Sequence, residues 1–245
     1  MAITQFLTAN VLLKRAKAPN PRHQFIVLCV GTLFSIACFI LINPWYGLIS
    51  LVLTGLFSTL VPIDPDTRAK YLAGAAGEEY ALSLLKQLPD SFTVFNQIHL
   101  PNHRSSTGSN EADLIVCGPN AIFIIEVKHN KGSILCDEQQ MQWQISKIGR
   151  KGTAYTTQMR NPVSQVKLLS WLLSEYLKKN DIKPWVQGLV LFTHPTVNLK
   201  GLNTVISLPV IQPHQLLGYI QSFQAKTIPK ALTISRTVNA ITYLR

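Results

Sequence analysis

The sequence has little acidic charge, few cysteines and none of the short motifs of several common enzyme classes. It contains 12 Asp or Glu residues against 23 Lys or Arg, a formal charge of +11 that favours a polyanionic partner, either nucleic acid or an anionic membrane. No Gly-rich phosphate loop, Ser-His-Asp order or Cys-His pair is present, so nucleotide hydrolysis and acyl transfer have no support. The cysteines show neither zinc-site spacing nor disulfide density, and we expect reduced packing residues at Cys29, Cys38, Cys117 and Cys136.

Hydrophobic residues, in contrast, make up 47% of the chain and are concentrated near its N-terminus. Residues 25–42 and 47–63 form two uncharged runs, each close to the roughly 20 apolar residues that cross a ~30 Å hydrocarbon core. The connector contains Pro44, a helix breaker, followed by Trp45 and Tyr46, which are typical of the membrane interface. This pattern predicts a two-helix transmembrane hairpin.

Basic residues flank the outer ends of the two runs and are absent from the connector. They are Lys14, Arg15, Lys17, Arg22, Arg68 and Lys70. The positive-inside bias therefore predicts a multi-pass protein of the inner or cytoplasmic membrane with both termini in the cytoplasm. A cleaved signal peptide, a re-entrant or interfacial hairpin and a pair of buried soluble helices are the alternatives. The late start and length of the first run disfavour the signal peptide, and the lack of a polar face disfavours buried helices.

The composition changes after Ile63 to that of an ordinary mixed domain without internal repeats. We expect a basic cytoplasmic tail over residues 1–23, the hairpin over 24–63, a linker over 64–70 and a folded domain over 71–245. Periodicity and turn signals predict helices and strands that alternate as in an α/β fold with a mixed sheet. The expected helices cover 69–88 and 161–179, and the expected strands cover 92–100, 111–117, 121–128, 132–136, 142–146 and 186–193.

Charged residues occur in two central strands that are otherwise apolar on both faces. If Pro119 and Asn120 are the loop residues, cross-strand partners have numbers that add up to 239. Asp113 then lies opposite Glu126, and the period of two places Lys128 on the same face.

Two opposed carboxylates in a buried sheet require a compensating positive charge. Their Cβ atoms would lie about 5 Å apart, and at an effective dielectric near 20 their repulsion is on the order of 3 kcal/mol. Mg²⁺ or Mn²⁺ would meet this need, and water on such a cation can act as the nucleophile in phosphodiester hydrolysis. Lys128 would orient that water or stabilise negative charge on the phosphate. The alternative is a salt-bridged strand end in which Lys128 neutralises Asp113 and Glu126.

Asp113 followed by Glu126-Val127-Lys128 resembles the PD-(D/E)xK nuclease motif. The motifs in order resemble those of the nuclease-related domain (NERD) family over residues 71–171; they are Gly74, Gly77-Glu78, Glu111-x-Asp113-Leu114-Ile115-Val116, Gly118-Pro119-Asn120, Phe123-x-Ile125-Glu126-x-Lys128, Lys131-Gly132, Trp143 and Asn161-Pro162-x-x-Gln165. The resemblance implies a restriction-endonuclease-like core, consisting of a helix, a three-stranded β-meander, a helix and a strand. It also implies metal-dependent hydrolysis of nucleic acid.

Two helical polar residues and one strand residue extend the candidate site. Glu78 shares a helix face with leucines at i+4 and i+7, whereas Glu79 does not, so Glu78 points at the sheet. The family resemblance implies a helical Glu near the metal, and we assign Glu78 as the third ligand beside Asp113 and Glu126. Gln165 also faces inward and is either a catalytic residue or a buried amide that holds a loop. Glu111 is either a partner of Lys128 or a ligand.

Basic residues downstream of these motifs are expected to form a phosphate-binding rim, or alternatively a solvated basic face: Lys131, Lys147, Arg150, Lys151 and Arg160. Two function classes follow. The first is a membrane-tethered, Mg²⁺-dependent nuclease that acts on DNA at the cytoplasmic side. The second is a membrane-anchored nucleic-acid-binding or scaffold module that has the nuclease fold without turnover.

Overall fold

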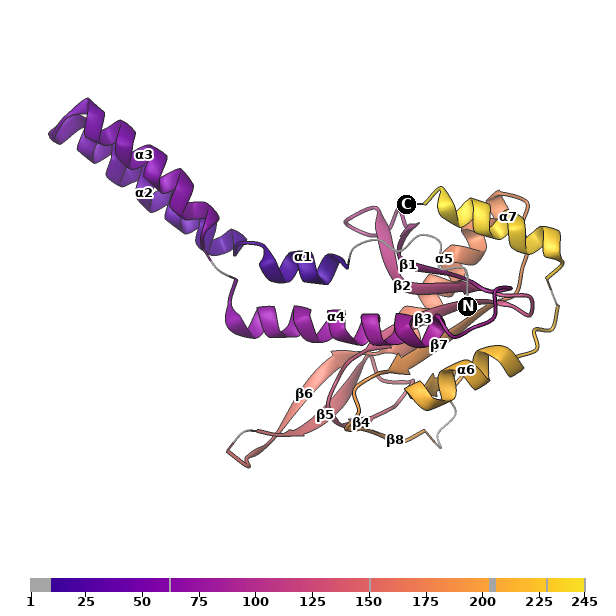
Figure 1. Cartoon of the computed structure of the whole chain (residues 1–245). Helices are drawn as coiled ribbons and strands as arrows, with labels where there is room; N and C mark the ends of the chain where they lie inside the picture. Colours follow the sequence, from indigo (N-terminus) through magenta and orange to yellow (C-terminus); the bar gives the residue numbers. More distant parts are fainter. Residues whose placement is uncertain (1–9, 62, 150, 203–205, 228, 245) are drawn as a thin grey trace. The chain divides into compact units, whose positions relative to one another are not determined.

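The computed structural model describes residues 10–61, 63–149, 151–202, 206–227 and 229–244 (Figure 1). Contacts within the chain divide it into two compact units, Asn10–Ala75 and the residues from Ala76 onward. The first unit contains three complete helices and the start of a fourth. They are α1 (Val11–Lys17), α2 (Pro21–Leu41), α3 (Pro44–Thr59) and α4 (Pro65–Leu85).

Helices α2 and α3 pack side by side as a hairpin (Figure 1). The break between them is local in origin, because the Asn43 side chain accepts a hydrogen bond from Trp45 N at 3.0 Å and Pro44 follows at the first helical position. The residues buried between the helices are small, and most are polar; Ser35 Oγ lies 2.9 Å from Ser50 Oγ. The outer surface is apolar, and Leu41 is 80% exposed. This distribution is the reverse of that in a water-soluble helical hairpin.

The prediction of two membrane spans is supported in part. Within the described residues, one candidate span is long and apolar enough to cross a membrane, judged by length and composition; it is Val11–Leu41, which comprises α1 and α2. Helix α3 has 16 residues, which corresponds to about 24 Å at 1.5 Å per residue and falls short of a ~30 Å hydrocarbon core. The hairpin is therefore present as a pair of packed helices, whereas two membrane spans are not shown.

Helix α4 begins earlier than the sequence pattern predicts. The Asp64 carboxylate accepts hydrogen bonds from Thr67 N at 2.9 Å and from Thr67 Oγ1 at 3.0 Å, which caps a helix starting at Pro65. Residues 65–70, expected as a linker, are therefore helical, and the helix ends at Leu85 instead of near Leu88.

A five-stranded mixed sheet forms the centre of the second unit, in the order β1-β2-β3-β7-β9. Its strands are β1 (Thr93–Pro101), β2 (Ser109–Cys117), β3 (Ile122–Lys128), β7 (Val186–Phe192) and β9 (Val210–Ile211). Strands β1, β2 and β3 form an antiparallel meander, and β7 is parallel to β3. The predicted α/β fold with a mixed sheet is confirmed. The β2–β3 register also agrees with the predicted value, from the Leu114–Ile125 pair to the Cys117–Ile122 pair.

Helices cover both faces of this sheet (Figure 1). Helix α4 and α6 (Pro213–Ser222) contribute to one apolar layer, and α5 (Pro162–Lys179) and α7 (Ala231–Thr242) contribute to the other. Gly188 permits the close approach of α5, since a Cβ atom there would lie 2.3 Å from Val166 Cγ1.

A second, four-stranded sheet in the order β6-β5-β4-β8 was only partly predicted. Its strands are β4 (Gly132–Leu135), β5 (Gln142–Ile148), β6 (Ala154–Arg160) and β8 (Val197–Lys200). The side chain of Trp143, on β5, is buried and stacks on Phe192. Its Nε1 donates to Asp137 O at 2.7 Å. Sequence patterns indicated β4 and β5 but not β6, β8 or β9.

Candidate nuclease site

The β2–β3 ladder stops one residue before the two predicted carboxylates. The last recorded pair is Leu114–Ile125, so Asp113 and Glu126 lie at the next level without a ladder pair. There, Val127 N donates a hydrogen bond of 2.8 Å to Asp113 Oδ2. A side-chain carboxylate thus accepts from the backbone of β3 where the regular ladder ends.

Strand alternation also breaks at this level, contrary to the regular period of two assumed from the sequence. Ala112 and Ile115 pack in the same apolar cluster, as do Phe95 and Ile98 of β1. Residues three apart on a regular strand face opposite sides of the sheet. Strands β1 and β2 therefore carry a matched irregularity beside Asp113. The register derived from the turn between β2 and β3 did not predict it.

Lys128 links β3 to α5. Its Nζ donates to Glu126 Oε1 and, at 3.3 Å, to Gln165 Oε1. Glu126 is 1% exposed, and within the described part of the chain its second oxygen, Oε2, has no hydrogen-bond partner. A buried carboxylate oxygen without a donor is costly and marks a place where a cation or another donor is expected.

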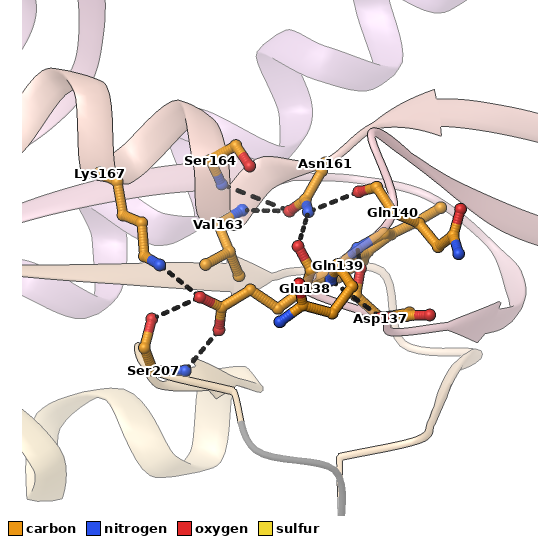
Figure 2. Close-up of polar contacts among 10 residues, drawn as sticks. Asp137, Glu138, Gln139, Gln140, Asn161, Val163, Ser164, Lys167 and Ser207 are labelled. Atoms are coloured by element: carbon orange, nitrogen blue, oxygen red, sulfur yellow. Dashed lines mark hydrogen bonds and ion pairs between the residues drawn. The ribbon is translucent and has the colours of Figure 1, made fainter.

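Asn161 caps the start of α5, the helix that bears Gln165, and Figure 2 shows the contacts of this cap. Asn161 Oδ1 accepts from Val163 N at 2.9 Å and from Ser164 N at 3.3 Å, so Asn161 is the N-cap of the predicted helix. Its Nδ2 donates in the other direction, to Glu138 O at 3.1 Å and Gln140 O at 2.8 Å. Asn161 therefore fixes the first turn of α5 to the segment between β4 and β5.

The Glu138 carboxylate adds a second attachment for the same helix (Figure 2). It accepts from Lys167 Nζ on α5 and from the backbone and hydroxyl of Ser207. These hydrogen bonds lower the pKa of Glu138 against the opposing effect of its burial, the largest single influence. Gln165 thus projects from a helix turn that is tied down on two sides.

Glu78 faces inward from α4, as its helix face predicts. It is 8% exposed, and its Oε2 accepts a hydrogen bond of 3.1 Å from Gln97 Nε2. Gln97 lies opposite Asp113 at the interruption of the β1–β2 ladder, so this hydrogen bond brings Glu78 to the level of Asp113. Gly77 allows the helix to come near, because a Cβ atom there would lie 2.7 Å from His129 Cβ. Sequence analysis did not identify Gln97, which lies on β1 without any local motif.

The electrostatics of the pair are unfavourable for two ionised acids. Burial raises the pKa of Asp113 well above its usual value, and the Glu126 carboxylate raises it further. Burial also raises the pKa of Glu126, an effect that Lys128 only partly offsets. Burial acts to lower the pKa of Lys128, but Glu126 and Asp113 outweigh it and the pKa is raised. The single positive charge of Lys128 therefore does not balance the negative charges of two ionised acids.

Within the described ranges, no group of three or more His, Cys, Asp or Glu side chains lies close enough to hold a metal ion. The predicted ligand set of Asp113, Glu126 and Glu78 is therefore not assembled as a complete cluster. The Asp113–Glu126 pair still fits a hard divalent cation, since Mg²⁺ is commonly held by one or two carboxylates together with waters and phosphate oxygens. The unsatisfied Glu126 Oε2 and the raised acid pKa values support this fit.

One of the two predictions for Glu111 was a pairing with Lys128. Among the described contacts, Glu111 instead lies beside His99. Its Oε2 lies 3.9 Å from His99 Nε2 on the neighbouring strand β1, where the two residues are ladder partners. The hydrogen-bond partners of Lys128 are instead Glu126 and Gln165. The interruption of the β2–β3 ladder before Asp113 explains the difference, because the register does not continue to Glu111.

The basic residues of the predicted rim occupy different places. Lys131 and Lys147 line a cavity of about 440 Å³ on the second sheet together with hydroxyl and amide side chains. Arg160 is exposed at the end of β6, where it is the ladder partner of Gln142. Lys151 is exposed in the turn between β5 and β6, and Arg150 lies outside the described residues.

Comparison with known proteins identifies the domain that carries these residues. Residues 73–193 match the family model of the nuclease-related domain, NERD. No curated protein and no solved structure gives a match to the chain. The matched segment runs from α4 to the residue after β7 and includes every residue of the candidate site, from Glu78 to Gln165. Over residues 73–193 the chain therefore belongs to the nuclease-related domain family, in agreement with a PD-(D/E)xK nuclease-like fold.

Proposed function

We propose that this protein is a membrane-tethered nuclease that hydrolyses phosphodiester bonds in DNA with Mg²⁺ or Mn²⁺. The observation that carries the proposal is the pair formed by half-buried Asp113 and buried Glu126, with an unsatisfied oxygen on Glu126 and Lys128 beside it, inside a nuclease-related domain. A structural salt bridge needs one acid for Lys128. The second acid, Asp113, is half-buried beside this ion pair and is better explained by a bound cation.

Asp113 and Glu126 would hold the cation, with Glu78 nearby. When bound, the cation supplies positive charge that stabilises the negatively charged phosphate. Lys128 would donate a hydrogen bond to a phosphate oxygen as charge develops there. Gln165 positions Lys128 by accepting from its Nζ at 3.3 Å, and Asn161 keeps Gln165 in place through the helix cap.

The test of activity is a cleavage assay on the full-length protein in detergent, with labelled DNA and RNA. We expect cleavage of DNA in Mg²⁺ or Mn²⁺ and none in EDTA. Absence of cleavage from wild-type protein that still binds DNA would support the alternative, a nucleic-acid-binding module with the nuclease fold.

Lys131 and Lys147 are proposed to contact the phosphate backbone of the substrate. The cavity that they line also presents Ser133, Thr196 and Asn198, and among the described residues that line it none is acidic. We expect the double substitution Lys131→Ala/Lys147→Ala to weaken DNA binding several-fold. The slope of log K against log salt concentration should become shallower by about 2, since each lost phosphate contact removes about 1. Fluorescence anisotropy at several salt concentrations measures this slope.

The matched control for this experiment is Lys179→Ala/Lys183→Ala. These two lysines are exposed near the end of α5, so the variant loses the same net charge without changing the cavity. An equal change of slope in both double variants would show that net charge alone matters and would reject the proposed phosphate contacts.

The helical hairpin is proposed to anchor the protein in the membrane with both termini in the cytoplasm. Its apolar exterior and its small, polar interior are typical of helices that pack within lipid. Basic residues at the outer ends of the hairpin, and none in the connector, support this orientation. Helix α3 can reach both interfaces if the bilayer thins locally or its flanking residues extend the span.

We expect a cysteine introduced at Tyr46 in the connector to react from outside with a membrane-impermeant maleimide in intact cells. A cysteine at Lys70, after the hairpin, should react only after the cells are opened. The protein should also remain with membranes after an alkaline wash, and deletion of residues 1–63 should release it. A single span would instead give external labelling at Lys70, and release of the full chain by the wash would exclude an integral anchor.

A further inference from the structure

Gln97 has an unusual backbone conformation beside the candidate site. Its φ is +52°, in the left-handed region that residues other than Gly seldom adopt. The flanking ladder pairs, Asn96–Leu114 and Ile98–Ala112, place Gln97 opposite Asp113, and no pair is recorded at this level. Strained backbone of this kind persists where the surrounding structure imposes it, and it is concentrated at functional sites.

The strained backbone directs a buried amide toward α4. The Gln97 side chain is 6% exposed, and its Nε2 donates to Glu78 Oε2 at 3.1 Å. Phe95 and Ile98 pack on the opposite layer, against α5 and α7, so the irregularity between them changes the face that this part of β1 presents. A regular strand would leave the alternation of β1 unbroken at this level.

The chemistry of the contact suits a carboxylate that must keep its charge. An amide N–H satisfies one oxygen of Glu78 without neutralising it, whereas a lysine or arginine would compete with a cation for the same carboxylate. Gln97 lies at the level of Asp113 on the neighbouring strand, so its hydrogen bond holds the Glu78 carboxylate beside this level of the sheet. The contact therefore fixes the orientation of a third acid beside the level of the sheet that bears Asp113.

We infer that Gln97 is a positioning residue for divalent-cation binding, which holds the Glu78 carboxylate toward Asp113 through a neutral hydrogen bond. This inference rests on the proposed metal-dependent function. The left-handed backbone at Gln97 is the means by which β1 delivers that hydrogen bond to a helix on the other side of the sheet from Phe95.

The first test is Gln97→Leu in the full-length protein in detergent. Leucine has a similar size and removes only the amide. We expect the dissociation constant for Mn²⁺, measured by calorimetry, to rise about tenfold, as is typical when an outer partner of a metal ligand is lost. The Mg²⁺ concentration for half-maximal cleavage should rise in parallel, with a smaller change in kcat. Gln144→Leu, at an exposed position of β5, is the matched control and should match wild type.

Gln97→Gly is the second variant and keeps the inference testable if the leucine variant does not fold. Glycine adopts the left-handed conformation without strain, so this variant should fold and still bind Mn²⁺ less tightly. Wild-type affinity in either folded variant would overturn the inference while leaving the proposed nuclease intact. If wild type binds Mn²⁺ without cleaving DNA, hydrolysis is rejected and the affinities still decide the role of Gln97. If wild type binds no Mn²⁺, both proposals fail.

Discussion

The Asp113→Asn substitution should lower the rate of Mg²⁺-dependent DNA cleavage by about 10²–10³-fold, the loss typical of removing one electrostatic group from an active site. Asparagine has the size of aspartate, and its carbonyl oxygen can still accept from Val127 N, so the local backbone contact is kept. What is lost is the negative charge that holds the cation with Glu126. Initial rates on labelled DNA, measured with full-length protein in detergent, give the ratio.

The control is Asp181→Asn, an exposed position just after α5. It makes the same chemical change away from the site, and its cleavage rate should stay close to that of wild type. Equal rates for Asp113→Asn and wild type would reject the assigned site. Cleavage that persists in EDTA in every variant would indicate a contaminating activity and no metal-dependent enzyme.

The second large effect concerns the stability of the metal-free protein. There the carboxylates that are needed for activity should lower the stability at neutral pH. Asp113 and Glu126 have pKa values that are raised in the folded protein, mainly by burial. A raised acid pKa means that the folded state binds the proton more tightly than the unfolded state. The resulting stabilisation is complete below the unfolded values, near pH 4, and is lost as pH rises through the raised folded values. Metal-free protein should therefore lose stability over this range.

Two changes should restore the stability that the metal-free protein loses at neutral pH: saturation with Mn²⁺ and the substitution Asp113→Asn. Saturation with Mn²⁺ at about 100 times its Kd stabilises by about 2.7 kcal/mol, which corresponds to roughly 5–10 °C in Tm for a domain of this size. Asp113→Asn should raise the Tm of the metal-free protein at neutral pH and weaken its response to Mn²⁺. Thermal melts from pH 4 to pH 8, with and without Mn²⁺, measure both effects. A wild-type Tm that does not respond to Mn²⁺ would contradict the assigned pair.

Much of the central fold could be predicted because each element carries a local signal. The Gly118-Pro119-Asn120 turn defines the register of β2 and β3, and Asn161-Pro162 marks the start of α5. Strand β6 lacked such a signal, since it lies at a sheet edge with mostly exposed side chains. Strands β8 and β9 have four and two residues, and their pairing depends on partners distant in sequence.

The candidate site shows the same limit at the level of single residues. The turn predicts that Asp113 and Glu126 occupy one level of the sheet, and the face argument directs Glu78 toward it. Neither predicts that the ladder is interrupted there, because the interruption depends on Val127 N binding a side chain and on the left-handed backbone at Gln97. The partners of Lys128 follow from this tertiary arrangement and not from strand periodicity.

Asn161 illustrates how one side chain can restrict what a position tolerates. Serine or aspartate would serve the helix cap equally well, since either supplies the acceptor for Val163 N. Neither supplies the two amide hydrogens that reach Glu138 O and Gln140 O. The substitution Asn161→Asp would therefore leave α5 capped but detached from the preceding segment, with a new negative charge facing two carbonyl oxygens. Loss of this single amide would loosen the helix turn that presents Gln165.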